Sequence, residues 1–141
     1  MATIEEVCQA YADYLNEQFA QDVIVGPVPG AEDIRVKDGQ VDPYVVVNFS
    51  DIISGIGRAF IGARGDDYVQ PINTVSIAHD YDTARWMQQK LNLVSLGYKP
   101  LGIAEVYKRA GGGVFITKTE DGAEAYMAPA SFAITVQLMS E

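Results

Sequence analysis

The chain is poor in the residues that most often perform catalysis or hold metal ions. Its 141 residues include one cysteine, Cys8, and one histidine, His79. A single cysteine cannot form an internal disulfide, which agrees with folding in a reducing compartment, and we expect Cys8 to act as a small, partly buried apolar residue. Without a second histidine or a thiolate cluster, the sequence predicts no metal site, no cofactor and no catalytic residues.

Long apolar runs and positive charge are also scarce. No segment approaches the ~20 apolar residues that a membrane-spanning helix needs, so we expect no membrane partner. The start of the chain has no basic stretch followed by an apolar one, and we therefore expect no signal peptide. The chain has 10 basic and 19 acidic residues, for a net charge of −9. Because nucleic-acid binding relies on clustered lysine and arginine, we expect no tight binding of DNA.

The acidic residues are concentrated in the first third of the chain. Residues 1–51 contain ten acidic and two basic residues, whereas the remainder is close to neutral. One interpretation is a solvated acidic surface that aids solubility. The other is a surface that lets DNA pass without holding it, because like charges repel phosphate groups.

Apolar spacing predicts two amphipathic helices. The first covers 3–19, where Thr3 and Glu6 have the spacing of a capping box. The second begins after Asp80 and Asp82 and ends before Gly97, since aspartate caps a helix start and glycine accepts a left-handed cap. Its apolar face is formed by Ala84, Met87, Leu91 and Val94.

Runs of β-branched and aromatic residues predict the strands. These runs cover 23–28, 43–49, 58–63, 71–78 and 131–138. The last run alternates, and it predicts an inward face of Phe132, Ile134, Val136 and Leu138 and an outward face of Ser131, Ala133, Thr135 and Gln137.

Turn signals predict two hairpins. Asp38-Gly39 suggests that 34–37 belongs to one, and the glycine-rich segment 109–112 predicts that 102–107 pairs with 113–118. The polar stretch 120–128 is expected to be a loop. We therefore expect a single α+β domain over 1–141, with two amphipathic helices packed on one face of a mixed, mainly antiparallel sheet.

The segment 50–57 is unusual because it combines glycines with isoleucines. Apolar side chains in a glycine-containing loop are a candidate contact with another subunit, and the alternative is that the loop folds back on its own core. Nearby arginines could meet acidic residues of a neighbour. The predicted subunit interface consists of Ile52, Ile53, Ile56, Arg58 and Arg64.

Short motifs in the chain do not add up to a chemical site. The glycines between 55 and 65 do not match a nucleotide-binding spacing, and no GK[ST] sequence follows them. The segment 79–82 offers three metal-ligand types, but aspartate is expected there as a helix cap. Trp86 lies next to the apolar face of the second helix, where it either flanks the core or anchors a partner.

The order of these segments resembles that of a known family. The segments that carry the likeness are the YVVVNF strand at 44–49, the PINTVSIA strand at 71–78 and the LGYKP helix end at 96–100. They resemble the tail terminator proteins of long-tailed bacteriophages, especially those of actinobacterial hosts. The likeness covers most of the chain and is densest over 62–100.

The resemblance implies a structural protein of the virion without enzymatic activity. Such proteins assemble in the host cytoplasm into a ring, typically a hexamer, at the head-proximal end of the tail tube. The implied partners are further copies of the chain, the major tail tube protein and a head-completion protein. Genomic DNA would pass through without specific binding. The resemblance assigns no individual functional residues.

Three other functions stay open at this stage. A head-closure or tail-completion protein would share the same composition. A small ligand-binding module would group Tyr11, Trp86 and Tyr98 around a pocket. An enzyme would need a cleft that joins His79 to Asp66 or Glu105.

Overall fold

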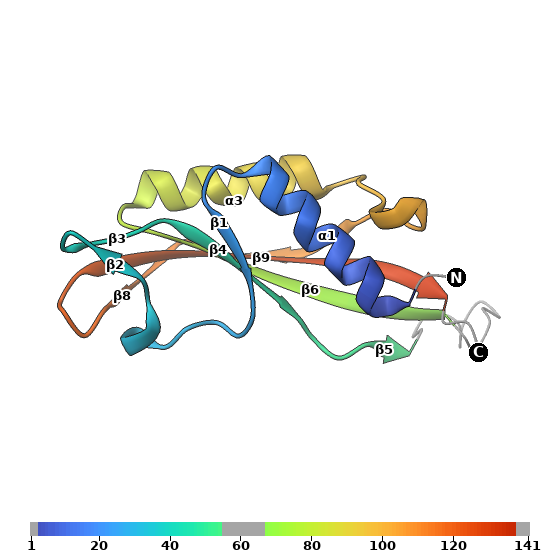
Figure 1. Cartoon of the computed structure of the whole chain (residues 1–141), viewed down its shortest axis with the longest axis horizontal. Coiled ribbons are helices and arrows are strands. Elements are labelled where there is room, and N and C mark those ends of the chain that lie inside the picture. Colours follow the sequence, from blue (N-terminus) through green and yellow to red (C-terminus); the bar gives the residue numbers. More distant parts are fainter. Residues whose placement is uncertain (1–2, 55–66, 138–141) are drawn as a thin grey trace.

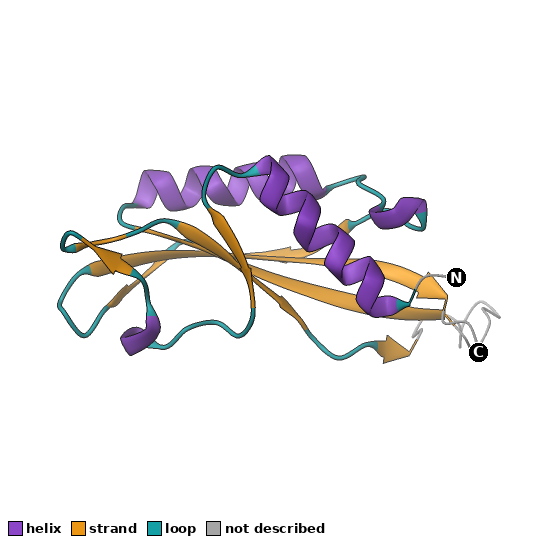
Figure 2. Ribbon diagram, viewed as in Figure 1, coloured by secondary structure: helices purple, strands orange, loops and turns teal. Residues whose placement is uncertain are grey.

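Two helices lie on one face of a twisted sheet (Figures 1 and 2). The structure is a computed structural model that describes residues 3–54 and 67–137. The helices are α1 (Ile4–Gln18) and α3 (Tyr81–Ser95). The described sheet has the strand order β1-β4-β6-β9-β7, with β5 also paired to β6 and β8 to β9. Only the β1–β4 pair is parallel. The predicted α+β architecture, with both helices on one face of a mainly antiparallel sheet, is confirmed.

The remaining elements are short and lie around this sheet. Its strands are β1 (Asp22–Val25), β4 (Tyr44–Phe49), β5 (Ile53–Ser54), β6 (Asp67–Ala78), β7 (Tyr107–Gly111), β8 (Phe115–Lys118) and β9 (Glu124–Gln137). A separate hairpin joins β2 (Val36–Lys37) to β3 (Gln40–Val41), and single turns form η1 (Ala31–Asp33) and η2 (Pro100–Gly102).

The pair formed by β6 and β9 is the spine of the sheet. The two strands are antiparallel in unbroken register from Asp67 opposite Gln137 to Ala78 opposite Tyr126. Each strand contains a proline, Pro71 in β6 and Pro129 in β9. Since proline has no N–H to donate, each of these positions removes one hydrogen bond to an outer strand.

At each of these interruptions, the side chain of a buried glutamine supplies the hydrogen-bond donor that the ladder lacks. Beside Pro71, the outer strand breaks between β4 and β5, and the Gln70 side-chain Nε2 donates to the carbonyls of Ser50 at 2.7 Å and Pro71 at 2.8 Å. Beside Pro129, the outer strand breaks between β7 and β8. There the Gln88 Nε2 donates to the carbonyls of Gly112 at 2.9 Å and Pro129 at 2.7 Å. Each amide thus satisfies two carbonyls at the point where the ladder is interrupted.

The main core lies between the sheet and the helices. Both helices and the strands of the sheet contribute buried side chains to this core. The fully buried ones include Tyr11 and Leu15 of α1, Met87 and Leu91 of α3 and Phe132 of β9. The helix spacing that predicted these faces is therefore confirmed. Two tyrosines of α1 also join the helices, because the Tyr11 hydroxyl lies 2.7 Å from Ser95 Oγ and the Tyr14 hydroxyl donates to the Val94 carbonyl at 2.7 Å.

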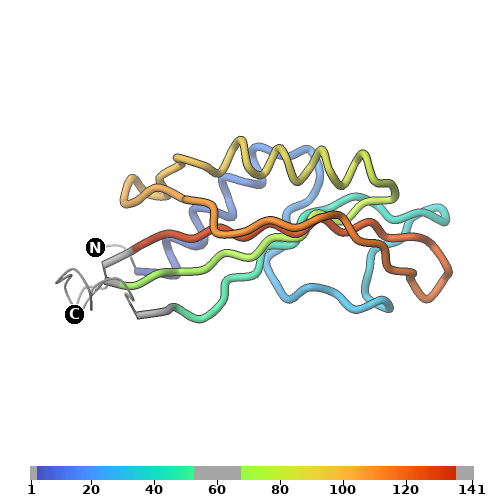
Figure 3. The backbone as a smooth tube through the Cα atoms, turned by 180° about the vertical axis from the view of Figure 1, so that it is seen from behind, coloured from blue at the N-terminus to red at the C-terminus, as the bar shows by residue number. Residues whose placement is uncertain are grey.

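A smaller core covers part of the opposite face. Ile34, just before the β2–β3 hairpin, and Val41, at its end, pack against this face, and the connection from β1 to the hairpin runs along the side of the sheet away from the helices (Figure 3). Asp38 and Gly39 have φ values of 54° and 79°, so this predicted turn is confirmed. Arg35 holds the hairpin in place through ion pairs to Asp22 at 2.8 Å and Asp42 at 3.1 Å. The buried apolar residues here are Ile34, Val41, Tyr44, Val46, Val75, Ile77, Ala125 and Met127.

The second predicted hairpin was wrong. Segments 107–111 and 115–118 do not pair with each other, because both lie along the same side of β9 as successive parts of one edge strand. The turn lies instead at 119–123, where the Thr119 N–H donates to the Ala123 carbonyl and Gly122 has a φ of 84°. The predicted loop at 120–128 was wrong from Glu124 onward, since β9 begins there.

Other strand predictions were partly right. The strand predicted at 71–78 begins earlier, at Asp67, because Pro71 lies inside the strand rather than at its start. In β9 the inward positions Phe132 and Ile134 are buried, but Ala133, predicted to face outward, is also fully buried. The strand predicted at 58–63 and Leu138 lie outside the described residues.

Replacing Gln88 with methionine tests its hydrogen bonds beside Pro129. The change keeps the side-chain length but leaves the Gly112 and Pro129 carbonyls without their donor, and Gln88 is 3% exposed. We expect the free energy of unfolding to fall by about 2–4 kcal/mol in urea denaturation. The exposed neighbour Gln89, changed to methionine, should shift it by less than about 0.5 kcal/mol. Equal effects of the two substitutions would contradict this role.

The cap of α3 should make stability depend on acid. The Asp80 side chain accepts from the Thr83 N–H at 2.7 Å, and hydrogen bonding to Thr83 lowers the pKa of Asp80 from its ordinary 3.8. A lowered folded-state pKa gives stability that is present above the unfolded pKa and lost as pH falls through the folded value. We expect Asp80→Ala to cost about 1 kcal/mol at pH 7 in thermal or urea unfolding, and the difference from wild type to shrink below about pH 4. If the stability difference between wild type and Asp80→Ala stayed constant down to pH 2, the ionised Asp80 cap would not be its cause.

Candidate functional site

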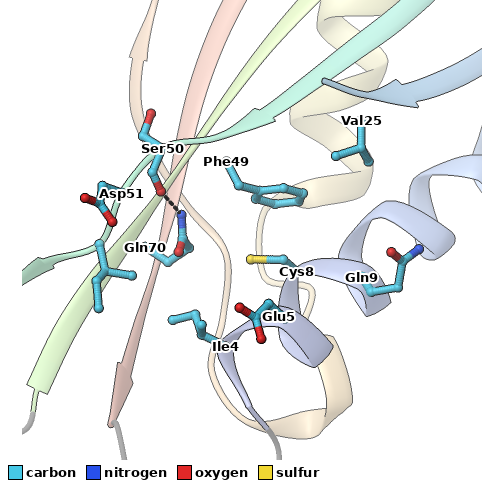
Figure 4. A pocket seen from close by; sticks show the side chains of 10 residues that line it. Ile4, Glu5, Cys8, Gln9, Val25, Phe49, Ser50, Asp51 and Gln70 are labelled. Carbon is cyan, nitrogen blue, oxygen red and sulfur yellow. Dashed lines mark hydrogen bonds between the residues drawn. The ribbon is translucent and has the colours of Figure 1, made fainter. Parts of the chain in front are cut away.

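An open hollow lies where β4 ends, between the start of α1 and the sheet (Figure 4). Its volume is about 430 Å³. Residues of α1, β1, β6 and the end of β4 with the segment after it line the hollow, and about half of these side chains are apolar. The lining residues are Ile4, Glu5, Cys8, Gln9, Val25, Phe49, Ser50, Asp51, Ile52 and Gln70.

The interruption beside Pro71 creates this hollow. The Gln70 amide holds the Ser50 carbonyl, as the dashed line in Figure 4 shows, and the chain leaves the sheet at this point. It returns as β5, where Ile53 pairs with Val69 of β6. The segment in between, which includes Ile52, therefore forms a wall of the hollow instead of continuing the ladder.

The predicted interface residues have different outcomes. Ile52 is half-buried and lines the hollow. Ile53 belongs to β5, so the prediction that the whole of 50–57 is a loop was wrong at this position. Ile56, Arg58 and Arg64 lie outside the described residues. Whether these five residues meet another subunit stays a prediction.

The cysteine in the hollow is poorly suited to nucleophilic chemistry. Burial, with a contribution from the charge of Glu5, raises the pKa of Cys8 from 9.0 to about 11. A thiol with this pKa is almost fully protonated at neutral pH, and the thiolate is the nucleophilic form. The described lining offers the carboxylates of Glu5 and Asp51 but no histidine that could take the proton. The hollow is therefore suited to apolar contact rather than to thiol catalysis.

The residues of the alternative catalytic site are not brought together. His79 lies 3.3 Å from Asp80 and lines a shallow hollow with Gln40 and Glu124. Glu105 is exposed in the segment before β7, and Asp66 lies outside the described residues. Across residues 3–54 and 67–137, no three histidine, cysteine, aspartate or glutamate side chains are grouped as metal ligands.

The residues of the alternative ligand pocket are also separate. Tyr11 is fully buried, whereas Trp86 is exposed beside Lys90, whose ammonium lies 5.2 Å from its ring centre. Tyr98 stacks on Tyr14 with ring centres 3.6 Å apart. Tyr98 and Trp86 therefore contribute to packing and surface in different places, not to one pocket.

The two edges of the sheet were not predicted from the sequence. Strand β1 forms one edge and β7 with β8 the other. The first carries exposed Ile24, Val25 and Val28, and the second carries exposed Tyr107, Phe115 and Ile116. A signal for the second edge exists in the sequence, because segment 107–118 contains three basic residues and no acidic one. This excess of basic residues can be interpreted only when the segment is known to be an edge of the sheet.

Comparisons with known proteins bear on the fold alone. No protein-family model and no curated protein matches the chain. Among solved structures, 28 chains match. One of them, which has no descriptive name, is 15% identical to this chain with a TM-score of 0.53. The match covers 100% of both chains. At this identity the likeness shows a shared fold and carries no function. None of the described helices has the length and apolarity to cross a membrane.

Alkylation of Cys8 should follow its raised pKa. We expect the rate of reaction with iodoacetamide to increase by about tenfold per pH unit from pH 7 to pH 10 without levelling off, because the thiolate fraction keeps rising. Mass spectrometry of the alkylated chain gives the rate. In urea the same cysteine should level off near its ordinary pKa of 9.0. A folded-state plateau below pH 9 would show that the thiol is not shielded by burial.

Proposed function

We propose that this chain is a structural phage protein that forms a ring at the head-proximal end of the tail tube. There it ends tube polymerisation and offers a surface to the head-completion protein. The protein acts through contacts among copies and with these partners, not through a reaction. The family resemblance of segments 44–49, 71–78 and 96–100 motivates the proposal.

The observation that carries the proposal furthest is the apolar hollow beside Ile52. It is open to solvent and lined by Ile4, Val25 and Phe49 as well as Ile52. Exposed apolar surface of this kind is typical of sites that bind another protein. It also includes a residue that the sequence had assigned to a subunit contact. A small-molecule site would more often be an enclosed pocket with convergent polar groups.

The charge of the N-terminal helix agrees with the proposal. Helix α1 carries Glu5, Glu6, Asp13 and Glu17 and no basic residue. Where such a surface faces a channel, it repels the phosphates of passing DNA and so avoids holding the genome.

Loss of the gene gives a direct test. In the phage that encodes the chain, we expect a null allele to produce tail tubes of uncontrolled length without heads, and a wild-type copy to restore virions. Electron microscopy measures both results. Antibody labelling should place the protein at the head-proximal end of the tail. Tails of normal length joined to heads in the null phage would refute the proposal, and labelling inside the head would favour a head-closure protein.

The substitution Ile52→Asp tests the hollow. We expect it to abolish complementation of the null allele, because a charge in the hollow opposes apolar contact, while far-ultraviolet circular dichroism still shows a folded protein. Leu93→Asp, at a position 82% exposed on the outside of α3, serves as the matched control and should complement. Full complementation by Ile52→Asp would remove the hollow from the contact surface.

A further inference from the structure

We propose that copies of this chain associate head to tail through the two opposite edges of the sheet. The acidic edge consists of β1 with Glu5 and Asp13 of α1, whereas Asp22 at the start of β1 is already paired with Arg35. The basic edge consists of β7 and β8 with Lys108, Arg109 and Lys118. The acidic edge of one copy binds the basic edge of the next copy. The inference deepens the proposed ring and rests on it for its biological role.

The acidic edge is built by one stripe of α1 along β1. Glu5, Gln9, Asp13 and Asn16 follow one another at spacings of four, four and three, which places them on one side of the helix. Asn16 binds β1 directly, since its amide accepts from the Val23 N–H and donates to the Val23 carbonyl, both at 3.3 Å. Gln9 shares the hollow with Val25 and donates to Asp13 at 2.8 Å. The stripe therefore brings Glu5 and Asp13 beside the edge.

The basic edge carries the opposite charge on the other side of the molecule. Lys108, Arg109 and Lys118 are all exposed. In residues 3–54 and 67–137, the close pairs between basic and acidic side chains are those of Arg35 with Asp22 and Asp42 and of His79 with Asp80. Arg85 of α3 extends the positive surface, because it lines one shallow hollow together with Lys108 and the glycines 111–113. Lys118 lies opposite Glu124 in the ladder, so the positive charge of this edge is concentrated at Lys108 and Arg109.

Apolar surface makes the two edges complementary in a second way. On the acidic edge, Ile24, Val25 and Val28 are between 39% and 50% exposed. On the basic edge, Tyr107, Phe115 and Ile116 are between 41% and 53% exposed. A patch of apolar side chains with charges around it is the usual composition of a protein interface. Because successive residues of a strand point to opposite faces, these apolar side chains border each edge on both faces of the sheet. They supply contact area, and the opposite charges fix which edges meet.

The contact is made by side chains and not by extension of the sheet. Asn16 already occupies the outward N–H and carbonyl of Val23, so β1 cannot accept a full additional strand. The basic edge is also irregular, with a bulge between Lys108 and Ala110 and a break at 112–114. Charges and bulges of this kind prevent indiscriminate pairing of edges. They leave an association that depends on the sign of the charges. Because the two patches differ and lie on opposite sides, successive copies either close into a ring or form a filament.

Charge reversal tests this arrangement in the full chain. The basic-edge variant is Lys108→Glu with Arg109→Glu, and the acidic-edge variant is Glu5→Lys with Asp13→Lys. Each variant places like charges opposite one another, so we expect each alone to raise the dissociation constant for self-association by about tenfold or more. An equimolar mixture of the two variants should assemble again, because each then meets edges of opposite sign. A chain that carries all four substitutions should assemble by itself. Sedimentation velocity measures association, and negative-stain electron microscopy shows the particles.

Matched controls separate local contact from net charge. Lys37→Glu with Lys99→Glu changes the net charge as the basic-edge variant does, at exposed positions away from both edges. Glu32→Lys with Asp82→Lys matches the acidic-edge variant, at exposed positions of η1 and α3 that lie outside the acidic stripe. Both controls should assemble like the wild type, and circular dichroism should show that every variant is folded.

The outcomes distinguish the inference from the proposed function. Wild-type rings that persist in both edge variants, or variants that the mixture does not restore, overturn the inference and leave the proposed function standing. Rescue by the mixture together with normal virions from the null phage supports the edge contact and overturns the proposed function. A wild-type chain that stays monomeric at all concentrations, with or without tail tubes, overturns the edge contact.

Discussion

The uninterrupted pairing of β6 with β9 is the constraint on which the rest of the structure depends. Both strands are long, both contain an internal proline, and each proline faces an outer strand that breaks. The breaks are tolerable only because Gln70 and Gln88 donate to the carbonyls left beside them. One break lets the chain leave the sheet and form the hollow at Ile52. The other divides an edge strand into β7 and β8. The same backbone limitation therefore shapes both candidate contact surfaces.

Local signals predicted the helices well. Thr3 with Glu6 and Asp80 with Thr83 form the expected caps, and Gly97 adopts a φ of 84° just beyond α3. These motifs act within one turn, so the sequence contains all that is needed to recognise them. The hairpin predicted around 109–112 failed for the opposite reason. Its glycines indicate a turn, but Pro129 of a later strand and Gln88 of a preceding helix make them a break in an edge strand instead.

The candidate site was predictable only in part. Ile52 could be singled out because an apolar residue in a glycine-containing segment is unusual, but its neighbours Ile4, Cys8 and Val25 come from distant parts of the chain. The edges could not be foreseen, because strand order decides which segments become edges, and the alternation of residues along a strand does not carry strand order. The sequence alone does not link the positive charge of 107–118 to the acidic stripe of α1. The link is visible only in the structure, where they lie at opposite edges of one sheet.

In the proposed head-to-tail contact, edges of opposite character would favour one ordered mode of association over random aggregation. Two like edges would join copies in pairs, and two neutral apolar edges would join them in any register. In this chain Asn16 blocks strand addition on one edge, and bulges make the other irregular. The proposed association would therefore depend on side chains whose charges accept only one orientation. Both helices cover the same face of the sheet, so successive copies would all present their helices to the same side of the assembly. In the proposed head-to-tail assembly, a rotation between successive copies that closes would give a ring, and one that does not close would give a filament.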